Sequence, residues 1–290
     1  MNSINTGAAK PTGTDLGSVS RQRARARRSY PFIEANDGAR LFYRDWGVGS
    51  PVVFCHPWGL SADIFEYQLT SLSERGIRCV AYDRRGHGRS DDPGYGYDLD
   101  SLAADLATVV EELDLRDATL VGYSMGAAEA IRYLTRSGVD RISRVLLTSP
   151  LPPAGADPGA TAAFTAALAK DRPAALADGL PLFLGRESLV SPPLAQWVLD
   201  QFLRTSPKAG IEFQRANAVS DYRDDLTTVS VATLIITGDA DEVCPLDQSG
   251  RVIAEAIPGS ELLIYEGAPH GIVLTHRDQF TRDLLRFVTG

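Results

Sequence analysis

The sequence predicts a doubly wound, mostly parallel α/β sheet that carries an inserted helical segment. Short apolar runs alternate along the chain with stretches of helical periodicity, which is the pattern of parallel strands joined by helices. The apolar runs are continuous, as in strands that are buried on both faces of a sheet. With 290 residues, 44% of them hydrophobic, the chain is long enough for one large domain with an inserted subdomain.

Three parts are expected along the chain. Residues 1–30 hold six basic residues and one acidic residue without periodicity, so we interpret them as a disordered basic tail. An arm that binds an anion or a partner is the alternative interpretation. Residues 31–150 and 227–290 are expected to form the α/β core. Residues 151–226 lack a buried-strand pattern and are expected to form a helical cap over the site.

The first part of the core begins with a predicted hairpin whose turn is Asn36-Asp37-Gly38. The hairpin strands are expected at 32–35 and 41–44, further strands at 51–55 and 78–82, and helices at 63–75 and 98–113. Ligand chemistry in such sheets lies beyond the carboxyl ends of the strands. The segments 56–60 and 83–90 therefore belong to the edge where a site is expected.

The rest of the chain repeats the alternation, apart from the insertion. Strands are expected at 118–121, 144–148, 232–236 and 261–265, and helices at 127–134 and 277–288. Seven prolines of the insertion are expected to break it into short helical pieces such as 162–170 and 194–203: Pro152, Pro153, Pro158, Pro173, Pro181, Pro192 and Pro193.

The pentapeptide Gly122-Tyr123-Ser124-Met125-Gly126 stands between a predicted strand and a predicted helix. A Gly-x-Ser-x-Gly sequence in this context predicts a nucleophile elbow. The turn is so tight that the serine takes a strained backbone, and the residues two positions away must lack side chains. We therefore expect the Ser124 hydroxyl to lie beyond the sheet, at the positive end of the following helix.

A serine hydroxyl needs a base to become a nucleophile, and the base needs an orienting acid. His270 follows the last predicted strand and is predicted as the base, with His276 as the runner-up. Asp239 and Asp241 both follow the preceding strand. We predict Asp241 as the acid because it lies far enough out to reach the imidazole, whereas Asp239 is expected to tie down the loop.

An oxyanion needs preorganised N–H donors. The backbone N–H of Met125 and that of Trp58 are predicted for this role, because Pro57 has no N–H. Six residues are candidates for the substrate pocket, and ordinary core packing is the alternative for them. These candidates are Trp58, Tyr123, Phe164, Phe183, Trp197 and Ile272. Phe202 of the expected cap is a further residue that could line the pocket.

From about Phe32 onward the chain resembles the α/β-hydrolase superfamily, and more narrowly its cofactor-free haloperoxidase (perhydrolase) and arylesterase branch. The matching stretches are 56–63, 83–90, 122–126, 238–241 with Pro245, and 267–271. The resemblance is weakest in the expected cap. It implies an α/β-hydrolase fold and a mostly structural role for residues 83–90.

The resemblance also implies the site residues. It implies a catalytic triad of Ser124, Asp241 and His270. It further implies that Trp58 and Met125 supply the oxyanion N–H groups.

Two departures from the perhydrolase pattern bear on the reaction. Members with marked perhydrolase activity tend to carry proline directly after the oxyanion tryptophan, where this chain has Gly59. They also tend to carry threonine and glycines after the nucleophile, where this chain has Met125, Ala127 and Ala128. Both departures favour hydrolysis over perhydrolysis. Gly59→Pro is accordingly expected to raise the ratio of perhydrolysis to hydrolysis, provided that the new ring does not clash.

We therefore expect a serine hydrolase that cleaves a small-molecule carboxylic ester or lactone through an acyl-enzyme on Ser124. Cofactor-free perhydrolase activity of the haloperoxidase type is one alternative. Acyl transfer or lactone processing in a biosynthetic pathway is another. A binding protein on a hydrolase scaffold is a further alternative, which an intact triad disfavours.

Composition narrows the partners. The net charge of −8 argues against nucleic acid, and no apolar run is long enough for a membrane span. No cluster of residues has metal-ligand spacing, and Gly86-His87-Gly88 is not a dinucleotide fingerprint, so neither metal nor cofactor is expected. Three cysteines form no even framework and are interpreted as inert core thiols of a cytoplasmic protein. The sequence is compatible with a homo-oligomer.

Overall fold

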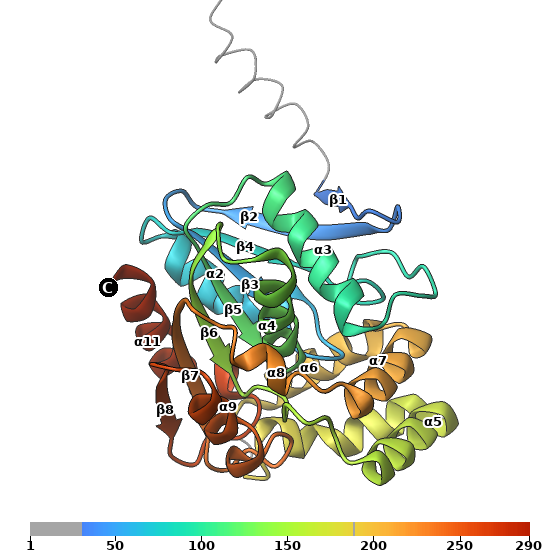
Figure 1. The fold of residues 1–290 in the computed structure, drawn as a ribbon. Helices are drawn as coiled ribbons and strands as arrows, with labels where there is room; N and C mark the ends of the chain where they lie inside the picture. Colours follow the sequence, from blue (N-terminus) through green and yellow to red (C-terminus); the bar gives the residue numbers. More distant parts are fainter. Residues whose placement is uncertain (1–30, 188) are drawn as a thin grey trace, which may run out of the picture. The chain divides into compact units, whose positions relative to one another are not determined.

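The fold is built on one eight-stranded sheet (Figure 1). The computed structural model describes residues 31–187 and 189–290, and the predicted tail lies outside the described residues. The strand order is β1-β2-β4-β3-β5-β6-β7-β8. The strands are β1 (Phe32–Glu34), β2 (Arg40–Trp46), β3 (Pro51–Cys55), β4 (Arg78–Tyr82), β5 (Ala118–Tyr123), β6 (Ile142–Thr148), β7 (Ala232–Gly238) and β8 (Glu261–Tyr265).

The pairing confirms the predicted mostly parallel, doubly wound sheet. The predicted hairpin forms, and β2 pairs antiparallel with both β1 and β4. All other neighbouring strands are parallel, so that Cys55 of β3 pairs with Gly122 of β5, and Tyr123 pairs with Thr148 of β6. The carboxyl ends of these strands therefore meet at one edge of the sheet.

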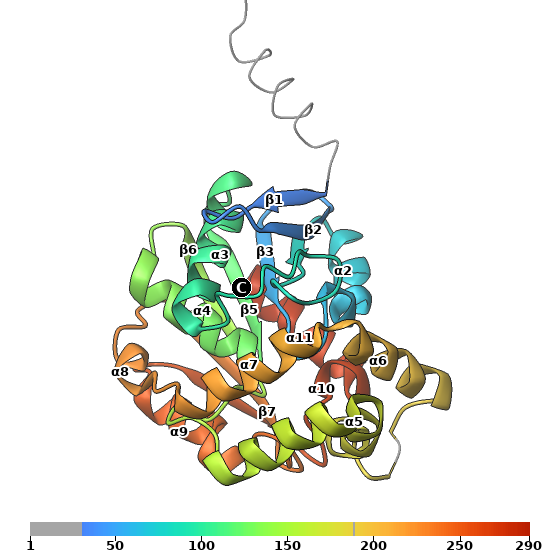
Figure 2. The same cartoon turned by 90° about the vertical axis from the view of Figure 1, so that its right-hand side faces the viewer.

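Helices cover both faces of the sheet (Figures 1 and 2). They are η1 (Ala62–Phe65), α2 (Glu66–Ser73), α3 (Leu99–Glu112), α4 (Met125–Ser137), α9 (Gly250–Ala256), α10 (Ile272–Thr275) and α11 (Arg277–Thr289), with a short turn η2 (Leu246–Gln248). Helix α3 packs on α4, whereas α2 packs on α11. The expected helix 63–75 thus begins as a 3-10 turn and ends at Ser73.

The central strand β5 shows why both faces need cover. All six of its residues are buried. Because successive side chains of a strand point to opposite faces, Leu120 joins a hydrophobic cluster with Val109 and Ile131, while Val121 joins another with Leu69 and Leu284. Burial on both sides holds this strand rigidly, and Ser124 follows directly after it.

The described residues of the insertion between β6 and β7 form four helices, of which α5 packs against both α6 and α7, while α8 lies beside α9 (Figure 2). They are α5 (Pro158–Leu184), α6 (Pro192–Arg204), α7 (Pro207–Val219) and α8 (Arg223–Leu226). Prolines occupy the first turns of α5, α6 and α7, where a missing N–H costs nothing. Among the helices that the structure describes, none is long and apolar enough to cross a membrane.

One expectation about these prolines is wrong. Pro181 lies inside α5 without ending it. The break in α5 falls at Asp171, whose φ of −153° and ψ of 87° are not helical, directly after the expected piece 162–170 and two residues before Pro173. The Asp171 carboxylate accepts a hydrogen bond from the N–H of Ala174, so this residue caps a second helical piece that begins with Arg172-Pro173.

Candidate active site

Ser124 lies at the sharp turn between β5 and α4. Its φ of 55° and ψ of −116° are strained for a residue with a side chain. A Cβ atom at Gly122 would lie 2.6 Å from the Cα of Ala127, and one at Gly126 would lie 2.1 Å from the carbonyl oxygen of Cys55. Both glycines are therefore required by close backbone approach, as the pentapeptide predicts.

The structure brings Ser124, His270 and Asp241 into one hydrogen-bonded chain. The Ser124 Oγ lies 3.0 Å from His270 Nε2, and His270 Nδ1 lies 2.8 Å from Asp241 Oδ2. Only 2–4% of each residue is exposed. In this arrangement the serine hydroxyl donates to Nε2, and the Nδ1–H donates to the carboxylate, which is the arrangement that general-base catalysis requires.

The two competing residues lie elsewhere. The Asp239 carboxylate accepts a hydrogen bond of 2.7 Å from the N–H of Gly267, and so it ties down the loop that carries His270. His276 precedes α11, and its Nδ1 lies 3.0 Å from the Thr275 hydroxyl. Neither group is hydrogen-bonded to Ser124 or His270 within the described part of the chain.

Opposing effects set the pKa of His270. Burial lowers this pKa because the imidazolium loses water, whereas the adjacent Asp241 carboxylate raises it. The carboxylate prevails, and the net direction is upward from the ordinary value of 6.5. The arrangement therefore stabilises the imidazolium that forms when the base accepts a proton.

Cys244 is a neighbour of the triad that the sequence does not reveal. Its thiol is buried and interacts with the side chains of His270 and Ser124, and burial raises its pKa. Its backbone N–H also donates to Asp241 Oδ1 at 2.8 Å. Interpreting all three cysteines as inert core thiols missed this position, although Cys244 stands only three residues after Asp241.

The loop that follows β3, residues 56–61, is called the oxyanion loop below. Gly126 abuts Cys55 at the start of this loop, so the first turn of α4 lies beside it. Met125 is the first residue of α4, where backbone N–H groups have no partner within the helix. The predicted donors Trp58 and Met125 thus belong to two neighbouring segments.

The condition attached to Gly59→Pro, that the new ring fits, is not met. Gly59 has a φ of +76°, whereas proline requires a φ near −65°. The Gly59 N–H also donates to His87 Nε2 at 3.2 Å, and proline has no N–H. A proline at this position would therefore displace the loop instead of only altering the reaction.

Two of the predicted pocket residues are fully buried, and two others have rings that lie next to His270 or Trp58. Tyr123 and Ile272 are fully buried, and the Tyr123 hydroxyl donates to the His270 carbonyl at 2.6 Å. The ring centroid of Phe183 lies 5.5 Å from that of His270, and the ring centroid of Phe164 lies 5.5 Å from that of Trp58.

Trp197, on α6, packs against the hydrophobic cluster that contains Val121. A cavity of about 10 Å³, room for about one water, lies beside Trp58 between α5, α6 and α7. Trp58 and Phe202, two of the residues predicted to line a pocket, lie in the wall of this cavity.

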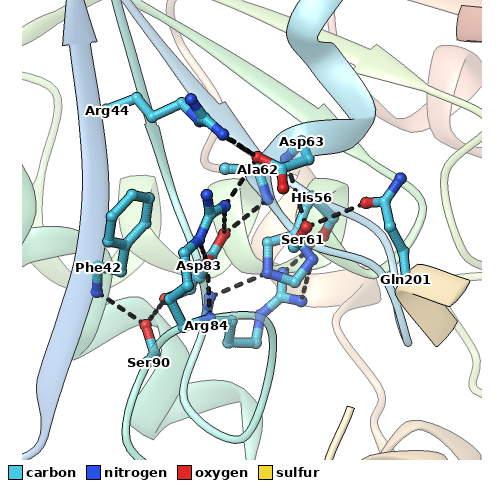
Figure 3. A network of polar contacts seen from close by, with 11 residues as sticks. Phe42, Arg44, His56, Ser61, Ala62, Asp63, Asp83, Arg84, Ser90 and Gln201 are labelled. Atoms are coloured by element: carbon cyan, nitrogen blue, oxygen red, sulfur yellow. Dashed lines mark hydrogen bonds and ion pairs between the residues drawn. The ribbon is translucent and has the colours of Figure 1, made fainter. Parts of the chain in front are cut away.

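The segment after β4, residues 83–90, is held in place by hydrogen bonds in which backbone N–H groups donate to side chains (Figure 3). The Asp83 carboxylate accepts hydrogen bonds of 2.8 Å from the N–H groups of Ala62 and Arg89. The Arg84 N–H donates to His56 Nε2 at 2.9 Å. These bonds join the segment to the oxyanion loop and to the turn that follows it.

Comparison with known proteins agrees with this architecture. The model of the alpha/beta hydrolase family matches residues 52–283. A non-heme haloperoxidase of Rhodococcus erythropolis is 35% identical over 278 residues, which cover 89% of this chain and 99% of that protein. The chain belongs to the alpha/beta hydrolase family.

Solved structures extend the likeness of this hydrolase to three dimensions. A bromoperoxidase from Bacillus anthracis has a TM-score of 0.87 and 36% identity, over 90% of this chain and 100% of the other. The esterase EaEST from Exiguobacterium antarcticum has a TM-score of 0.85 and 34% identity over the same shares. The predicted α/β-hydrolase fold and the resemblance to its haloperoxidase and esterase branch are confirmed.

Proposed function

We propose that this hydrolase cleaves a carboxylic ester or lactone through an acyl-enzyme on Ser124. The observation that carries the proposal is the buried hydrogen-bonded chain of Ser124, His270 and Asp241. The esterase and haloperoxidase relatives support the same class of reaction. Substrates are expected to be small molecules.

In the proposed first step, Ser124 Oγ attacks the carbonyl carbon while its proton passes to His270 Nε2. The Asp241 carboxylate stabilises the resulting imidazolium. The N–H groups of Trp58 and Met125 stabilise the oxyanion, each being worth about 3 kcal/mol in such sites. His270 then gives the proton to the departing alkoxide, which leaves the acyl group on Ser124.

The second step restores the enzyme. His270 removes a proton from water, which attacks the acyl carbonyl, and the acid departs as Ser124 regains its proton. If hydrogen peroxide replaces water, the product is a peracid, and this is the alternative that the haloperoxidase relative supports. If an alcohol replaces water, the reaction is acyl transfer. We propose that hydrolysis dominates, because Gly59 and Met125 depart from the perhydrolase pattern.

The domain organisation enters the proposal as well. We propose that residues 31–150 and 227–290 act as the catalytic core and residues 151–226 as a cap that shapes the acyl pocket. Phe164 and Phe183 lie beside Trp58 and His270 respectively, which supports an apolar pocket wall. We also propose that the protein acts in the cytoplasm.

The test is a screen of aryl esters and lactones of graded acyl size with Ser124→Ala as the blank. A fluorophosphonate probe should label wild-type protein, and Ser124→Ala should abolish labelling and cleavage together. Ser143 lies at the end of β6 opposite to Thr148, which pairs with Tyr123 next to Ser124. Ser143→Ala therefore serves as the matched control and should retain both labelling and cleavage. Peroxide-dependent bromination of a dione, measured on the same preparation, should be slower than ester cleavage. Bromination as fast as cleavage would favour the perhydrolase alternative.

A further inference from the structure

The α6–α7 junction, residues 201–210, lies along the oxyanion loop and is hydrogen-bonded to it at three points. The hydroxyl of Ser61 donates to Gln201 Oε1 at 3.0 Å, as Figure 3 shows. The hydroxyl of Thr205 donates to the Gly59 carbonyl at 2.7 Å. These two contacts pair residues that are at least 140 positions apart in the sequence.

The third contact involves the residue that carries the proposed oxyanion donor. The indole N–H of Trp58 donates to the Gly210 carbonyl at 2.9 Å. The Trp58 ring also packs against Phe164 of α5 and Phe202 of α6, with centroids 5.5 and 5.9 Å apart. All three long helices of the insertion therefore hold this one side chain.

Gly59, the residue that follows Trp58, is fixed on three sides. Its N–H donates to His87 Nε2, and its carbonyl accepts from the hydroxyl of Thr205. A Cβ at Gly59 would lie 2.5 Å from the ring of Phe202, so the α-carbon is in contact with the cap as well. Burial lowers the pKa of His87, so the ring is neutral, and its Nδ1–H donates to the backbone carbonyl of Arg85 while Nε2 accepts from the Gly59 N–H.

These contacts restrict the backbone on both sides of the Trp58 α-carbon. The side-chain hydrogen bond fixes the direction of the Cα–Cβ bond, and the Gly59 contacts fix the following peptide plane. The N–H of Trp58 itself lies in the preceding peptide, which is planar and whose carbonyl, on Pro57, lies 2.7 Å from His56 Nδ1. With that plane held as well, little freedom remains for the N–H of Trp58. Catalysis by an oxyanion hole depends on this direction, because the donor must point at the position that the oxyanion will occupy.

We infer that Thr205 is a positioning residue, and that the α6–α7 junction sets the orientation of the oxyanion-binding N–H of Trp58. The inference rests on the proposed function, since it assigns Thr205 to that same site. Thr205 is buried, and its hydroxyl is the group that holds the Gly59 carbonyl. Loss of that hydroxyl leaves the Gly59 carbonyl unpaired and removes one of the bonds that hold the loop.

The experiment compares Thr205→Val, which has nearly the same shape without the hydroxyl, with Thr205→Ser, which keeps it. Thr165→Val is the matched control, because the Thr165 hydroxyl is also buried in the cap but bonds within its own helix. Thr205→Val should lower kcat about tenfold or more with little change in KM, since misplaced transition-state donors cost rate. Thr205→Ser should recover most of kcat, and Thr165→Val should match wild type.

Two readouts separate positioning from simple attachment of the cap. The affinity for a boronic acid, which mimics the tetrahedral intermediate, should fall with kcat/KM in Thr205→Val. Amide hydrogen exchange in residues 58–61 should accelerate in the same variant without any ligand. If Thr205→Val does not fold, Trp58→Phe, which loses the bond to Gly210, should show the same exchange and kcat effects.

The outcomes distinguish this inference from the proposed function. If Ser124→Ala abolishes esterase activity but Thr205→Val keeps wild-type kcat, boronate affinity and amide exchange, the positioning role is overturned alone. If exchange accelerates while kcat and boronate affinity stay unchanged, Thr205 holds the loop without positioning the donor, and the inference fails. If wild-type protein cleaves no ester or lactone, the proposed function fails together with the catalytic part of the inference.

Discussion

At the scale of single residues, Asp241 and His270 are each held by contacts outside the triad. The N–H groups of Val243 and Cys244 donate to Asp241 Oδ1, which leaves Oδ2 free to face the imidazole. The Tyr123 hydroxyl holds the His270 carbonyl from the elbow strand. The proposed base and acid are therefore oriented before any substrate arrives.

Asp241→Asn should lower kcat by about 10⁴-fold, because loss of the orienting acid leaves the imidazole in the wrong tautomer. Asp239→Asn is the matched variant, since Asp239 holds the N–H of Gly267 and does not face the imidazole. It should keep turnover and lose about 1 kcal/mol of stability, as expected for a weakened hydrogen bond. Steady-state kinetics and denaturant unfolding of both variants check this, and the reverse pattern would assign the acid to Asp239.

The activity should also depend on pH through His270. The base works only when neutral, and Asp241 raises its pKa above 6.5, so activity should fall as the pH drops through that raised pKa. The acidic limb of kcat/KM is therefore expected to lie above pH 6.5. In Asp241→Asn the limb of the residual activity should move to lower pH. A limb that stays in place would show that another group controls it.

At the scale of elements, the strand–turn–helix unit of β5 and α4 is determined by backbone contact. Gly126 allows α4 to begin against the end of β3, where no side chain fits. This contact brings the first turn of α4 and the oxyanion loop together. Gly179 in α5 is not required by such a contact, because an added Cβ there would meet nothing within 4 Å.

Gly126→Ala should therefore be strongly destabilising, by about 1–3 kcal/mol or more, because its Cβ would overlap the Cys55 carbonyl. Gly179→Ala is the matched control inside α5 and should stabilise by about 0.5–1 kcal/mol, since alanine loses less entropy than glycine in a helix. Thermal or urea unfolding measures both changes. Equal stability of the two variants would contradict the tight turn.

At the scale of the whole molecule, a buried ion pair joins segments on both sides of the elbow. Glu129 of α4 pairs with Arg84, which follows β4, and the Arg84 guanidinium donates to the His56 carbonyl at 2.8 Å. The Tyr82 hydroxyl donates to Glu129 as well. Both charged side chains are almost completely buried, so each depends on the other for compensation.

Glu129→Leu should lower the free energy of unfolding by about 3–5 kcal/mol, because it leaves the Arg84 charge buried without a partner. The double variant Arg84→Met/Glu129→Leu should be less destabilised than Glu129→Leu alone, since no unpaired charge remains. Urea unfolding of the two variants checks the order. A double variant less stable than the single one would show that the pair contributes more than charge compensation.

Local patterns in the sequence are enough to predict the central strands, the elbow and the parallel sheet. Continuous apolar runs predict the central strands, because a strand covered on both faces has no polar side. The pentapeptide around Ser124 predicts the elbow, because the clash of a Cβ with the neighbouring backbone is a local requirement. Alternation of strands and helices predicts the parallel sheet and hence the edge where Ser124, Asp241 and His270 lie together.

Only the tertiary structure decided which long-range contacts form. The φ of +76° at Gly59 and the bond from Thr205 to Gly59 depend on segments that pack across the site. Cys244 lies against the triad for the same reason. Periodicity and turn chemistry report the preferences of neighbouring residues, whereas the bond between Thr205 and Gly59 joins positions 146 residues apart, where only the packed chain brings the two groups together.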